Sequence, residues 1–539
     1  MKKVFAMIFV LTLCIGLLAG CEITPAETVP TTTSEPAGTT APTHETQPTG
    51  TEPAAYSFEG KTLDVCAGHS AAMDGTDLNR FIESTLGIDI RWVVRPMDGV
   101  AIYASRIPVP SLVFTTQGLS GGITTYGSYG AYVNFWEYQE LMPNFFALFN
   151  DESNPEMVAY RQAYMASENK LYVAPVFLGG DVQRCGWMYR EDIFRELGLE
   201  VPTDWDSFVE ALRKLKAAYP DAHPFAMRSD SGTGLYAMGE FAQQFGVNFS
   251  VDAARDPYTE NYYDPAVTEE YRNMIRCIRQ LIDEGLMDAA CLSWDITQLQ
   301  KSFADGRSFI TYDRAFRLND LELAGQECDP AFSLAWFHNL PFFTDPDNSV
   351  PYQCREAGVK GYAWYVPAMC DDPELAIRYL DWLYSEEGSR ILSWGIEGES
   401  YGVDAEGNKY YLEGFDTTYM ARYQESGLVD FSALVSKYSP KCQAMILDTM
   451  EAAASGGWEK TPTNLAWNVQ EQMLMDTYYQ SWVDAKADYL VRSLSGEVDI
   501  DDDAVWDAYR ESLNEFRVDQ LLDAYNASYA RFLERRKVI

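Results

Sequence analysis

The pattern of apolar and polar residues marks three short strands near the start of the folded region. Residues 62–67 and 88–94 alternate, 111–116 are predicted as a third strand, and Asp77–Leu86 has the spacing of a helix between the first two. A repeated order of strand, loop, helix and strand is typical of α/β folds. The pattern therefore predicts an α/β lobe with a largely parallel sheet.

A second group of elements follows Lys170. Apolar runs at 171–173 and 187–189 predict two strands, and Glu191–Leu197 predicts a helix that ends at Gly198. We interpret this stretch as the passage of the chain from one lobe to another. Further strands are predicted at 224–228, 307–312 and 358–366, further helices at 208–218, 267–284, 297–303 and 375–384, and an almost wholly helical tail at 417–539.

The N-terminus has the pattern of a bacterial export signal. Lys2 and Lys3 precede an apolar run at 4–18 that is short for a membrane span, and Leu18-Ala-Gly-Cys21 resembles a lipobox. That resemblance implies a signal peptide at 1–20, cleavage before Cys21, and a lipid such as palmitate on its sulfur. An uncleaved membrane anchor is the alternative. Either interpretation predicts a protein held on the extracellular face of the cell membrane.

Composition separates a spacer from the folded part. Residues 21–56 are rich in Thr and Pro with almost no large apolar residues, which predicts a disordered spacer. The 539-residue chain is too long for one core, so two or more lobes are expected. Its formal net charge of −39 makes a nucleic-acid partner improbable. An aromatic content of 14% supplies flat apolar faces, some of which can stack on sugar rings.

Cysteine and histidine usage gives no sign of a metal site. Eight of the ten cysteines lie beyond Cys21, scattered and without a C-x-x-C pair, and only four histidines occur. We expect cysteines in strands and helices, such as Cys66 and Cys277, to be buried thiols. The acidic run 499–503 lacks the glycine and final glutamate of a calcium loop and is interpreted as the start of a helix.

Four segments together resemble one protein family: 171–175 (Leu-Tyr-Val-Ala-Pro), 187–208, 305–311 and 378–401. They are similar to the extracellular solute-binding lipoproteins of ABC importers, family 1 (carbohydrate-type), in the long form found in Gram-positive bacteria. The resemblance covers 57–539. It implies an α/β, two-lobe periplasmic-binding-protein-like (type II) fold with an interlobe hinge and a helical C-terminal region.

The same resemblance implies that each lobe is built from two chain segments. Lobe 1 is expected at 57–182 and 338–396, and lobe 2 at 183–337 and 397–539. The hinge would then be crossed near 183–187, 336–340 and 396–401. Two roles remain open for the helical tail, which either buttresses lobe 2 or caps the cleft between the lobes.

Sugar sites combine an aromatic face with planar polar groups that bind hydroxyls. We therefore expect ligand contacts at strand ends and hinge crossings. The candidates are His69, Gln117, Tyr126 and Trp364 in lobe 1, Gln183, Trp187, Trp394, Glu397 and Tyr401 at the hinge, and Arg228, Tyr236, Asp313 and Arg314 in lobe 2.

Each candidate also has a purely structural interpretation. Trp187 and Trp364 lie within strands and would equally well face a core, while Trp394 could pack a hinge helix. Arg228 and Arg314 would bind either a ligand carboxylate, as in a uronic-acid oligosaccharide, or a neighbouring acidic side chain.

Sequence motifs give little support to catalysis. No G-x-S-x-G and no phosphate-binding G-x-x-x-x-G-K-[ST] occurs, and Glu397 and Glu399 flank Gly398 in the expected hinge turn. We predict no catalytic residue, no cofactor and no metal. The expected function is capture of an oligosaccharide or other small solute by a monomer that delivers it to ABC permease subunits. A secreted glycan hydrolase or lyase, and a surface adhesin, remain alternatives.

Overall fold

The structure is a computed structural model. It describes residues 56–67, 70–94, 109–116, 118–119, 121–229, 238–247, 253–256, 259–338, 354–356, 359, 361–420, 426–454, 458–460 and 465–537. Among these residues, no helix combines the length and apolarity needed to cross a bilayer. The predicted signal, spacer and lipid site, Cys21 included, lie outside the described residues.

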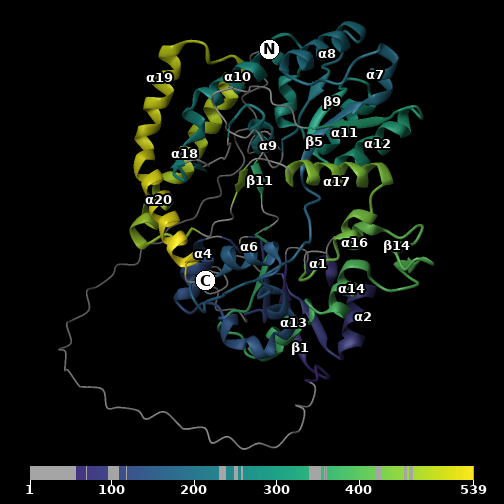
Figure 1. Ribbon diagram of the computed structural model, residues 1–539, viewed down its shortest axis with the longest axis vertical. Coiled ribbons are helices and arrows are strands. Elements are labelled where there is room, and N and C mark those ends of the chain that lie inside the picture. The colour runs from purple at the N-terminus through teal and green to yellow at the C-terminus, as the bar shows by residue number, and fades with distance from the viewer. Residues whose placement is uncertain are drawn as a thin grey trace, which may run out of the picture. The chain divides into compact units, whose positions relative to one another are not determined.

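Two separate sheets organise the described chain (Figure 1). The first has the strand order β2-β1-β3-β12-β4 and the second the order β10-β5-β9-β6. Their strands are β1 (Thr62–Cys66), β2 (Asp89–Trp92), β3 (Leu112–Thr115), β4 (Ala174–Pro175), β12 (Ala363–Tyr365), β5 (Cys185–Arg190), β6 (Phe225–Ala226), β9 (Ile310–Arg314) and β10 (Leu334–Phe337).

Three two-stranded pairs complete the β-structure of the described residues: β7 (Ala254–Arg255) with β8 (Tyr262–Tyr263), β11 (Cys354–Glu356) with β15 (Trp458–Lys460), and β13 (Tyr401–Val403) with β14 (Lys409–Tyr411).

Helices fill most of the remaining described chain. They are α1 (Ser70–Met73), α2 (Asp77–Leu86), α4 (Gly121–Ser128), α5 (Pro143–Phe149), α6 (Pro155–Tyr164), α7 (Glu191–Leu197), α8 (Trp205–Ala218), α9 (Met238–Gln243), α10 (Glu269–Asp283), α11 (Ile296–Ala304), α12 (Arg317–Cys328), α13 (Pro373–Trp382), α14 (Glu386–Trp394), α15 (Thr417–Met420), α16 (Phe431–Ser436), α17 (Pro440–Ala454), α18 (Val469–Ser495), α19 (Asp503–Ser512) and α20 (Val518–Arg536). Four 3₁₀ turns accompany them: η1 (Phe135–Leu141), η2 (Pro265–Val267), η3 (Ala289–Ser293) and η4 (Leu513–Phe516).

The first sheet is mixed. β1 pairs in parallel with both β2 and β3, as the predicted strand–helix–strand order requires, whereas β12 pairs antiparallel with β3 and β4. Leu63, Val65 and Cys66 of β1 are fully buried. The strand expected at 171–173 forms directly after that segment, as β4. At Leu171 the carbonyl instead accepts a hydrogen bond from the amide of Phe135.

The second sheet has an aromatic core on one face. β5 lies antiparallel to β10 and β9, and β6 lies parallel to β9. Because side chains alternate along a strand, Trp187 faces the side covered by α8 and α9, where it meets Phe208 and Phe241. On the opposite face Met445 of α17 lies close to Gly186. Helices therefore cover both faces of this sheet.

The order of the elements takes the chain between the two lobes three times. The first passage joins β4 to β5, and the second lies between β10 and β12. The third comes after 396–401. Phe177 of the first lobe donates to the Gly427 carbonyl and accepts from the Val429 amide, at 2.8 and 2.9 Å. The chain reaches the second lobe's core at Val435, near the end of α16, and α17 continues there with Cys442, Met445 and Ile446. Residues 397–434 therefore precede the entry into the second lobe.

The helical tail is anchored in the second lobe. α18 and α20 contribute Trp482, Leu490 and Tyr525 to the same core as β5 and α10, and α18 lies beside α10 in Figure 1. Asp264, which is buried, accepts from the Trp482 indole at 2.8 Å and from the Lys486 ammonium at 3.4 Å. These contacts are those of a tail that buttresses the second lobe, which is one of the two roles considered for it. In the last turn of α20, the Arg536 guanidinium also donates a hydrogen bond to the side-chain oxygen of Gln162 in α6.

Two expectations about individual residues are confirmed. Acidic residues near 499–503 begin a helix, since the Asp502 carboxylate caps α19 by accepting from the Ala504 amide at 2.8 Å. Six of the described cysteines, Cys66 and Cys277 among them, are buried. Burial raises the pKa of Cys277 and Cys291 to about 12, so these thiols stay protonated and unreactive.

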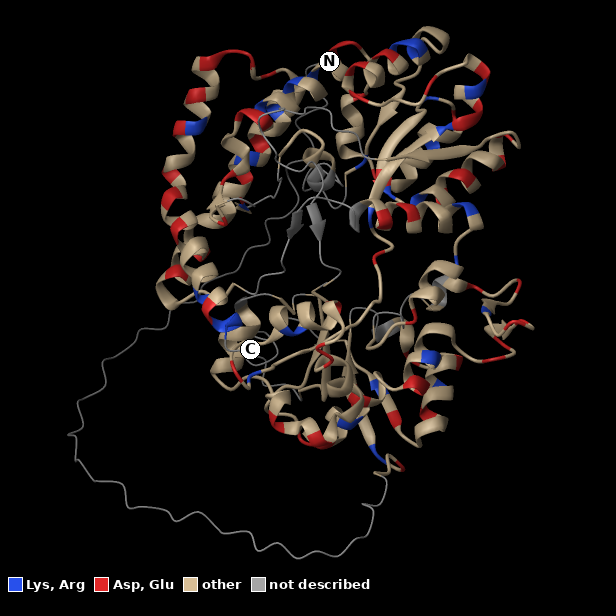
Figure 2. Ribbon diagram, in the orientation of Figure 1, with Lys and Arg blue, Asp and Glu red and all other residues tan. Residues whose placement is uncertain are grey.

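Acidic side chains are spread over the helices of both lobes and the tail (Figure 2). In the described residues, no group of three or more His, Cys, Asp or Glu side chains is arranged to hold a metal ion. The surface charge is therefore a distributed feature and does not point to one site.

Candidate ligand-binding site

Ten of the thirteen candidate residues can be located. His69, Gln117 and Tyr236 lie outside the described residues, so the structure gives no account of them. The other ten fall into five places: the edge of the second sheet, the core on one face of that sheet, the first passage between the sheets, the first lobe, and the β13–β14 hairpin.

The register of the second sheet collects three candidates at one edge. β5 begins at Cys185, directly after the first passage, and Cys185 and Gly186 lie opposite Arg314 and Asp313 of β9. β6 runs parallel to β9, so Arg228, two residues beyond β6, reaches the same edge. The ends of two strands thus present polar residues at the edge where the chain enters from the first lobe, which is the place where ligands of α/β sheets bind.

Arg228 and Asp313 form a buried ion pair at this edge. Arg228 Nε and Nη2 donate to the two Asp313 carboxylate oxygens at 2.6 and 3.0 Å, and the two side chains are only 3% and 1% exposed. Burial raises the pKa of the Asp313 carboxyl, while the hydrogen bonds and charge of Arg228 act in the opposite direction. Arg228 therefore binds a neighbouring acid and is closed to a ligand carboxylate in this conformation. Arg314 beside it is less buried, with its guanidinium 5.9 Å from the Phe316 ring.

Trp187 belongs to the core. Its side chain is fully buried, its ring stacks on Phe337 at 5.3 Å, and its Nε1 donates to Gln244 Oε1 at 2.7 Å. A ring enclosed in this way has no face left for a sugar. The sequence left open whether the Trp187 ring faces a ligand or the core, and in the structure it faces the core.

Gln183 lies on the first passage itself. Its amide donates to Asp181 Oδ1 at 2.9 Å, and the Asp181 and Arg184 side chains on either side approach to 3.7 Å and are largely buried. Gln183 is half-buried between them. Of the hinge candidates, it is the one that the structure keeps at a passage with part of its surface exposed.

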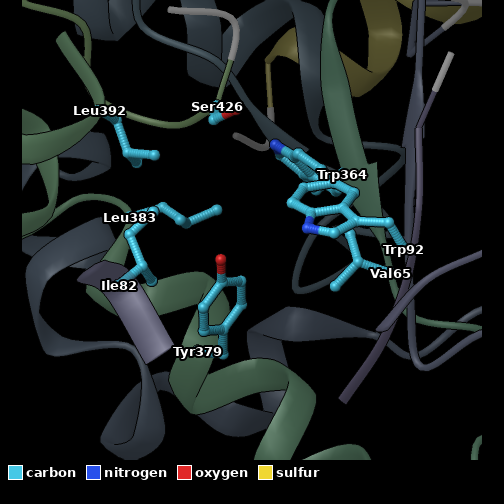
Figure 3. Close-up of a pocket in the computed structure, with 8 residues that line it drawn as sticks. All are labelled: Val65, Ile82, Trp92, Trp364, Tyr379, Leu383, Leu392 and Ser426. Atoms are coloured by element: carbon cyan, nitrogen blue, oxygen red, sulfur yellow. The ribbon is translucent and has the colours of Figure 1, made fainter. Parts of the chain in front are cut away.

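The two candidates located in the first lobe differ in how much of their side chains is exposed. Tyr126 of α4 is 40% exposed and free to present its ring, whereas Trp364 of β12 is 3% exposed and packs edge-on against Phe114 at 5.1 Å. Trp364 also lines a cavity of about 10 Å³. The cavity walls are Val65, Ile82, Trp92, Trp364, Tyr379, Leu383, Leu392 and Ser426 (Figure 3).

That cavity is no sugar site. Its volume is close to the minimum for a single water molecule, and ligand pockets are larger by more than an order of magnitude. Figure 3 shows the Tyr379 hydroxyl directed into it between apolar side chains. We therefore interpret it as a packing defect between the first sheet and helices α2, α13 and α14.

Trp394, Tyr401 and Glu397 form a structural cluster around the hairpin. The Trp394 indole is buried, donates to Asp430 Oδ2 at 2.7 Å and packs against Tyr411 at 5.0 Å. Tyr401 is buried beside it, with its hydroxyl 3.5 Å from Glu397 Oε2. These residues hold the β13–β14 hairpin on α14 and α16, within the first lobe rather than at a hinge.

The hydrogen bond from Trp394 also has an electrostatic effect. Burial opposes ionisation of Asp430, but hydrogen bonds from Ser432 and Trp394 and the charge of Lys409 together leave the pKa of its carboxyl below the ordinary value. Asp430 is thus held as a carboxylate that caps α16 and orients the indole.

Three residues of the second-sheet edge were missed by sequence reasoning. Trp336 is half-buried near the end of β10, and its Nε1 donates to Asp448 Oδ2 of α17 at 2.7 Å. His338 follows β10, with Nδ1 3.8 Å from the same oxygen. An aromatic residue and a histidine at the end of a strand before an expected hinge crossing were a usable signal. Asp448, in the middle of a helix, gave none.

Comparison with known proteins assigns a family to part of this framework. Residues 152–397 match the model of the family described as bacterial extracellular solute-binding protein. This segment contains the first passage between the sheets, the whole second sheet and β12. No curated protein matches the chain.

Solved structures share the fold over most of the chain. Alginate-binding protein AlgQ2, solved without calcium, has 17% identity and a TM-score of 0.64 over 88% of this chain and 98% of its own. An extracellular solute-binding protein from Bifidobacterium longum subsp. infantis has 14% identity and a TM-score of 0.65 over 88% and 98%. The binding protein FusA of Streptococcus pneumoniae, solved with kestose, has 16% identity and a TM-score of 0.63 over 88% and 99%.

These likenesses establish the two-lobe α/β fold with a helical C-terminal region. Within that fold, the segment 152–397 carries the sequence pattern of the bacterial extracellular solute-binding protein family.

Proposed function

We propose that this protein is the substrate-binding component of an ABC importer, which captures an oligosaccharide between its lobes and delivers it to permease subunits. The observation that carries the proposal is the family match at 152–397, because this segment spans the passage between the sheets and the sheet edge beside it. Ligand contacts to both lobes would favour a closed form, which the permease would then recognise.

Carbohydrate is the favoured ligand class for two reasons. Among the structural neighbours, one is an alginate-binding protein, one an HMO-binding protein and one was solved with kestose. The located candidates with accessible surface, Tyr126, Gln183 and Arg314, also offer an aromatic face and planar hydrogen-bonding groups. We propose these three as ligand contacts, with His69, Gln117 and Tyr236 from the original set.

The lobes are proposed to comprise 57–182 with 338–434, and 183–337 with 435–539. This division keeps the expected first and second passages and moves the third to the end of α16. Binding as a monomer is proposed, without a catalytic residue.

We further propose that 1–20 is a cleaved signal peptide and that lipidated Cys21 tethers the protein through the spacer at 21–56. Substitution of Cys21 by Ser should release the protein from the membrane, because the acyl chains are lost while the folded lobes are untouched. Detergent phase partitioning of the protein expressed in a Gram-positive host measures this. The expected result is wild type in the detergent phase and the variant in the aqueous phase. Both proteins in the detergent phase would instead favour an uncleaved anchor.

The function is tested by thermal melting of the protein with kestose, an alginate oligosaccharide and an HMO mixture, with product analysis of the same samples. A ligand at about 100 times its Kd stabilises the native state by about 2.7 kcal/mol, so a rise in melting temperature of a few degrees is expected with at least one sugar and no cleavage. Cleaved product would support the hydrolase or lyase alternative. No shift with any of these sugars would contradict the proposal and favour the adhesin.

A further inference from the structure

An indole held in place by a carboxylate lies at the edge of the second sheet. β10 is the edge strand of the order β10-β5-β9-β6, and Trp336 within it is half-buried. Its Nε1 donates to Asp448 Oδ2 at 2.7 Å. The hydrogen bond restricts rotation of the ring, so the part of the indole that remains exposed keeps one orientation.

The strand register places Trp336 and the nearby His338 beside the first passage between the sheets. Phe337 of β10 lies opposite Trp187 of β5, so His338 follows at the level of Gly186, within two residues of the passage. The same edge carries Asp313 and Arg314 of β9. Trp336 and His338 thus lie near the end of the sheet at which the chain enters from the first lobe, with Asp448 of α17 beside them.

The three side chains offer complementary chemistry to a sugar ring. An indole face packs against the apolar C–H face of a pyranose, and a carboxylate accepts hydrogen bonds from its hydroxyls. Among the described residues, nothing donates a hydrogen bond to Asp448 Oδ1, and the Asp448 side chain is 35% exposed. His338, 64% exposed, supplies a further polar group beside the same carboxylate.

Other described tryptophans are less suited to stacking. Trp187 and Trp394 are fully enclosed, and their indole nitrogens are bonded inside the protein. Trp136 is half-buried like Trp336, but it packs edge-on against Phe146 within the η1–α5 turn. Among these four, Trp336 alone combines partial exposure, a fixed orientation and an adjacent carboxylate with a free oxygen.

We propose that Trp336, Asp448 and His338 form a subsite for one sugar ring of the bound oligosaccharide. Trp336 stacks on the ring, Asp448 accepts from one hydroxyl through Oδ1, and His338 contacts the rim of the subsite. The proposal rests on the proposed function and adds a second-lobe site to it.

The test compares Trp336→Ala with the matched variant Trp136→Ala. Each is titrated calorimetrically with whichever of kestose, the alginate oligosaccharide or the HMO mixture stabilises the wild type. Trp336→Ala should raise the Kd at least tenfold, because aromatic anchors dominate binding energy at such sites. Trp136→Ala should change the Kd less than threefold. Melting of the unliganded variants shows whether each is folded.

A second variant distinguishes stacking of Trp336 on the sugar from a purely structural role of its ring. Trp336→Phe retains an aromatic face and should bind more tightly than Trp336→Ala. It should also lose most of the ligand-induced change in tryptophan fluorescence, since the reporter ring is gone while the other 12 of 13 tryptophans remain. A purely structural role would leave that change intact. Asp448→Ala should weaken binding as well, whereas Asp448→Asn, which keeps an acceptor oxygen, should weaken it less.

The possible outcomes distinguish failure of the subsite proposal from failure of the proposed function. If the wild type binds none of the sugars, the proposed function fails and the subsite fails with it. If the wild type binds and the folded Trp336→Ala variant binds with equal affinity, the subsite alone is overturned.

Discussion

Replacing Arg228 by Met should destabilise the protein by about 3–5 kcal/mol, because it leaves the Asp313 carboxylate buried without its partner. In the wild type both oxygens of Asp313 accept from Arg228, and the Asp313 side chain is 1% exposed. Met has a similar length and is apolar, so little packing is lost. Urea denaturation followed by fluorescence measures the difference at neutral pH.

The penalty should depend on pH in a defined direction. Burial already raises the pKa of Asp313, and removal of Arg228 removes the opposing charge, so the folded-state pKa of the variant rises further. A carboxyl whose folded pKa exceeds its unfolded pKa is most favourable to folding at low pH, and that stability falls as pH rises above about 4. The variant should therefore lose less stability at pH 5 than at pH 8.

The control is the double variant Arg228→Met with Asp313→Leu. Replacing both partners by apolar residues removes the orphaned charge, and most of the lost stability should return. Arg228→Met within about 1 kcal/mol of the wild type would contradict a buried ion pair at this edge. No recovery in the double variant would mean that the Arg228 packing, rather than the pair, carries the effect.

Local signals explain which parts of the fold could be predicted. The helix expected at Asp77–Leu86 has those bounds because Thr76 caps it, its side chain accepting from the Asn79 amide. The helix after Pro202 begins at Trp205 because Asp204 and Ser207 form a capping box. Strand periodicity likewise located β1 and β3. Each of these signals lies within a few residues of the feature it determines.

The candidate site could be predicted less well, because it depends on distant parts of the chain. Whether Trp187 faces core or ligand depends on Phe208, Phe241 and Phe337, which no local pattern connects to it. Trp336 and Asp448 meet across 112 residues. Strand ends identify the edge of the sheet at which Arg228, Asp313 and Arg314 gather, but the direction of each side chain there is set by packing.

The third passage was misplaced for a related reason. The segment 394–401 has the composition expected of a hinge turn, yet Trp394 and Tyr401 are enclosed by the β13–β14 hairpin that follows. Burying two large aromatic rings in the first lobe outweighs any turn preference of Gly395 or Gly398. The chain can leave this lobe only after the hairpin has closed over them.

Gly427→Ala should destabilise the protein by roughly 3 kcal/mol, since two unfavourable effects combine at this position. Gly427 has a φ of +132°, which residues with a side chain rarely adopt. An added Cβ would also lie 2.6 Å from the Leu383 carbonyl oxygen, a backbone atom that cannot rotate away. The Gly427 carbonyl accepts a hydrogen bond from the Phe177 amide at 2.8 Å. A shift of the Gly427 backbone would therefore weaken this hydrogen bond, which lies just before the third passage.

Gly398→Ala is the matched control for this prediction. Gly398 also has a positive φ, of +81°, but nothing lies within 4 Å of an added Cβ. Its substitution should cost only the backbone strain, about 1 kcal/mol. Denaturation of both variants gives the difference, and sugar titration should show weaker binding for Gly427→Ala alone, because only that glycine adjoins a passage between the lobes. Equal costs for the two substitutions would mean that Leu383 moves away freely, and that the contact between Phe177 and Gly427 does not fix the third passage.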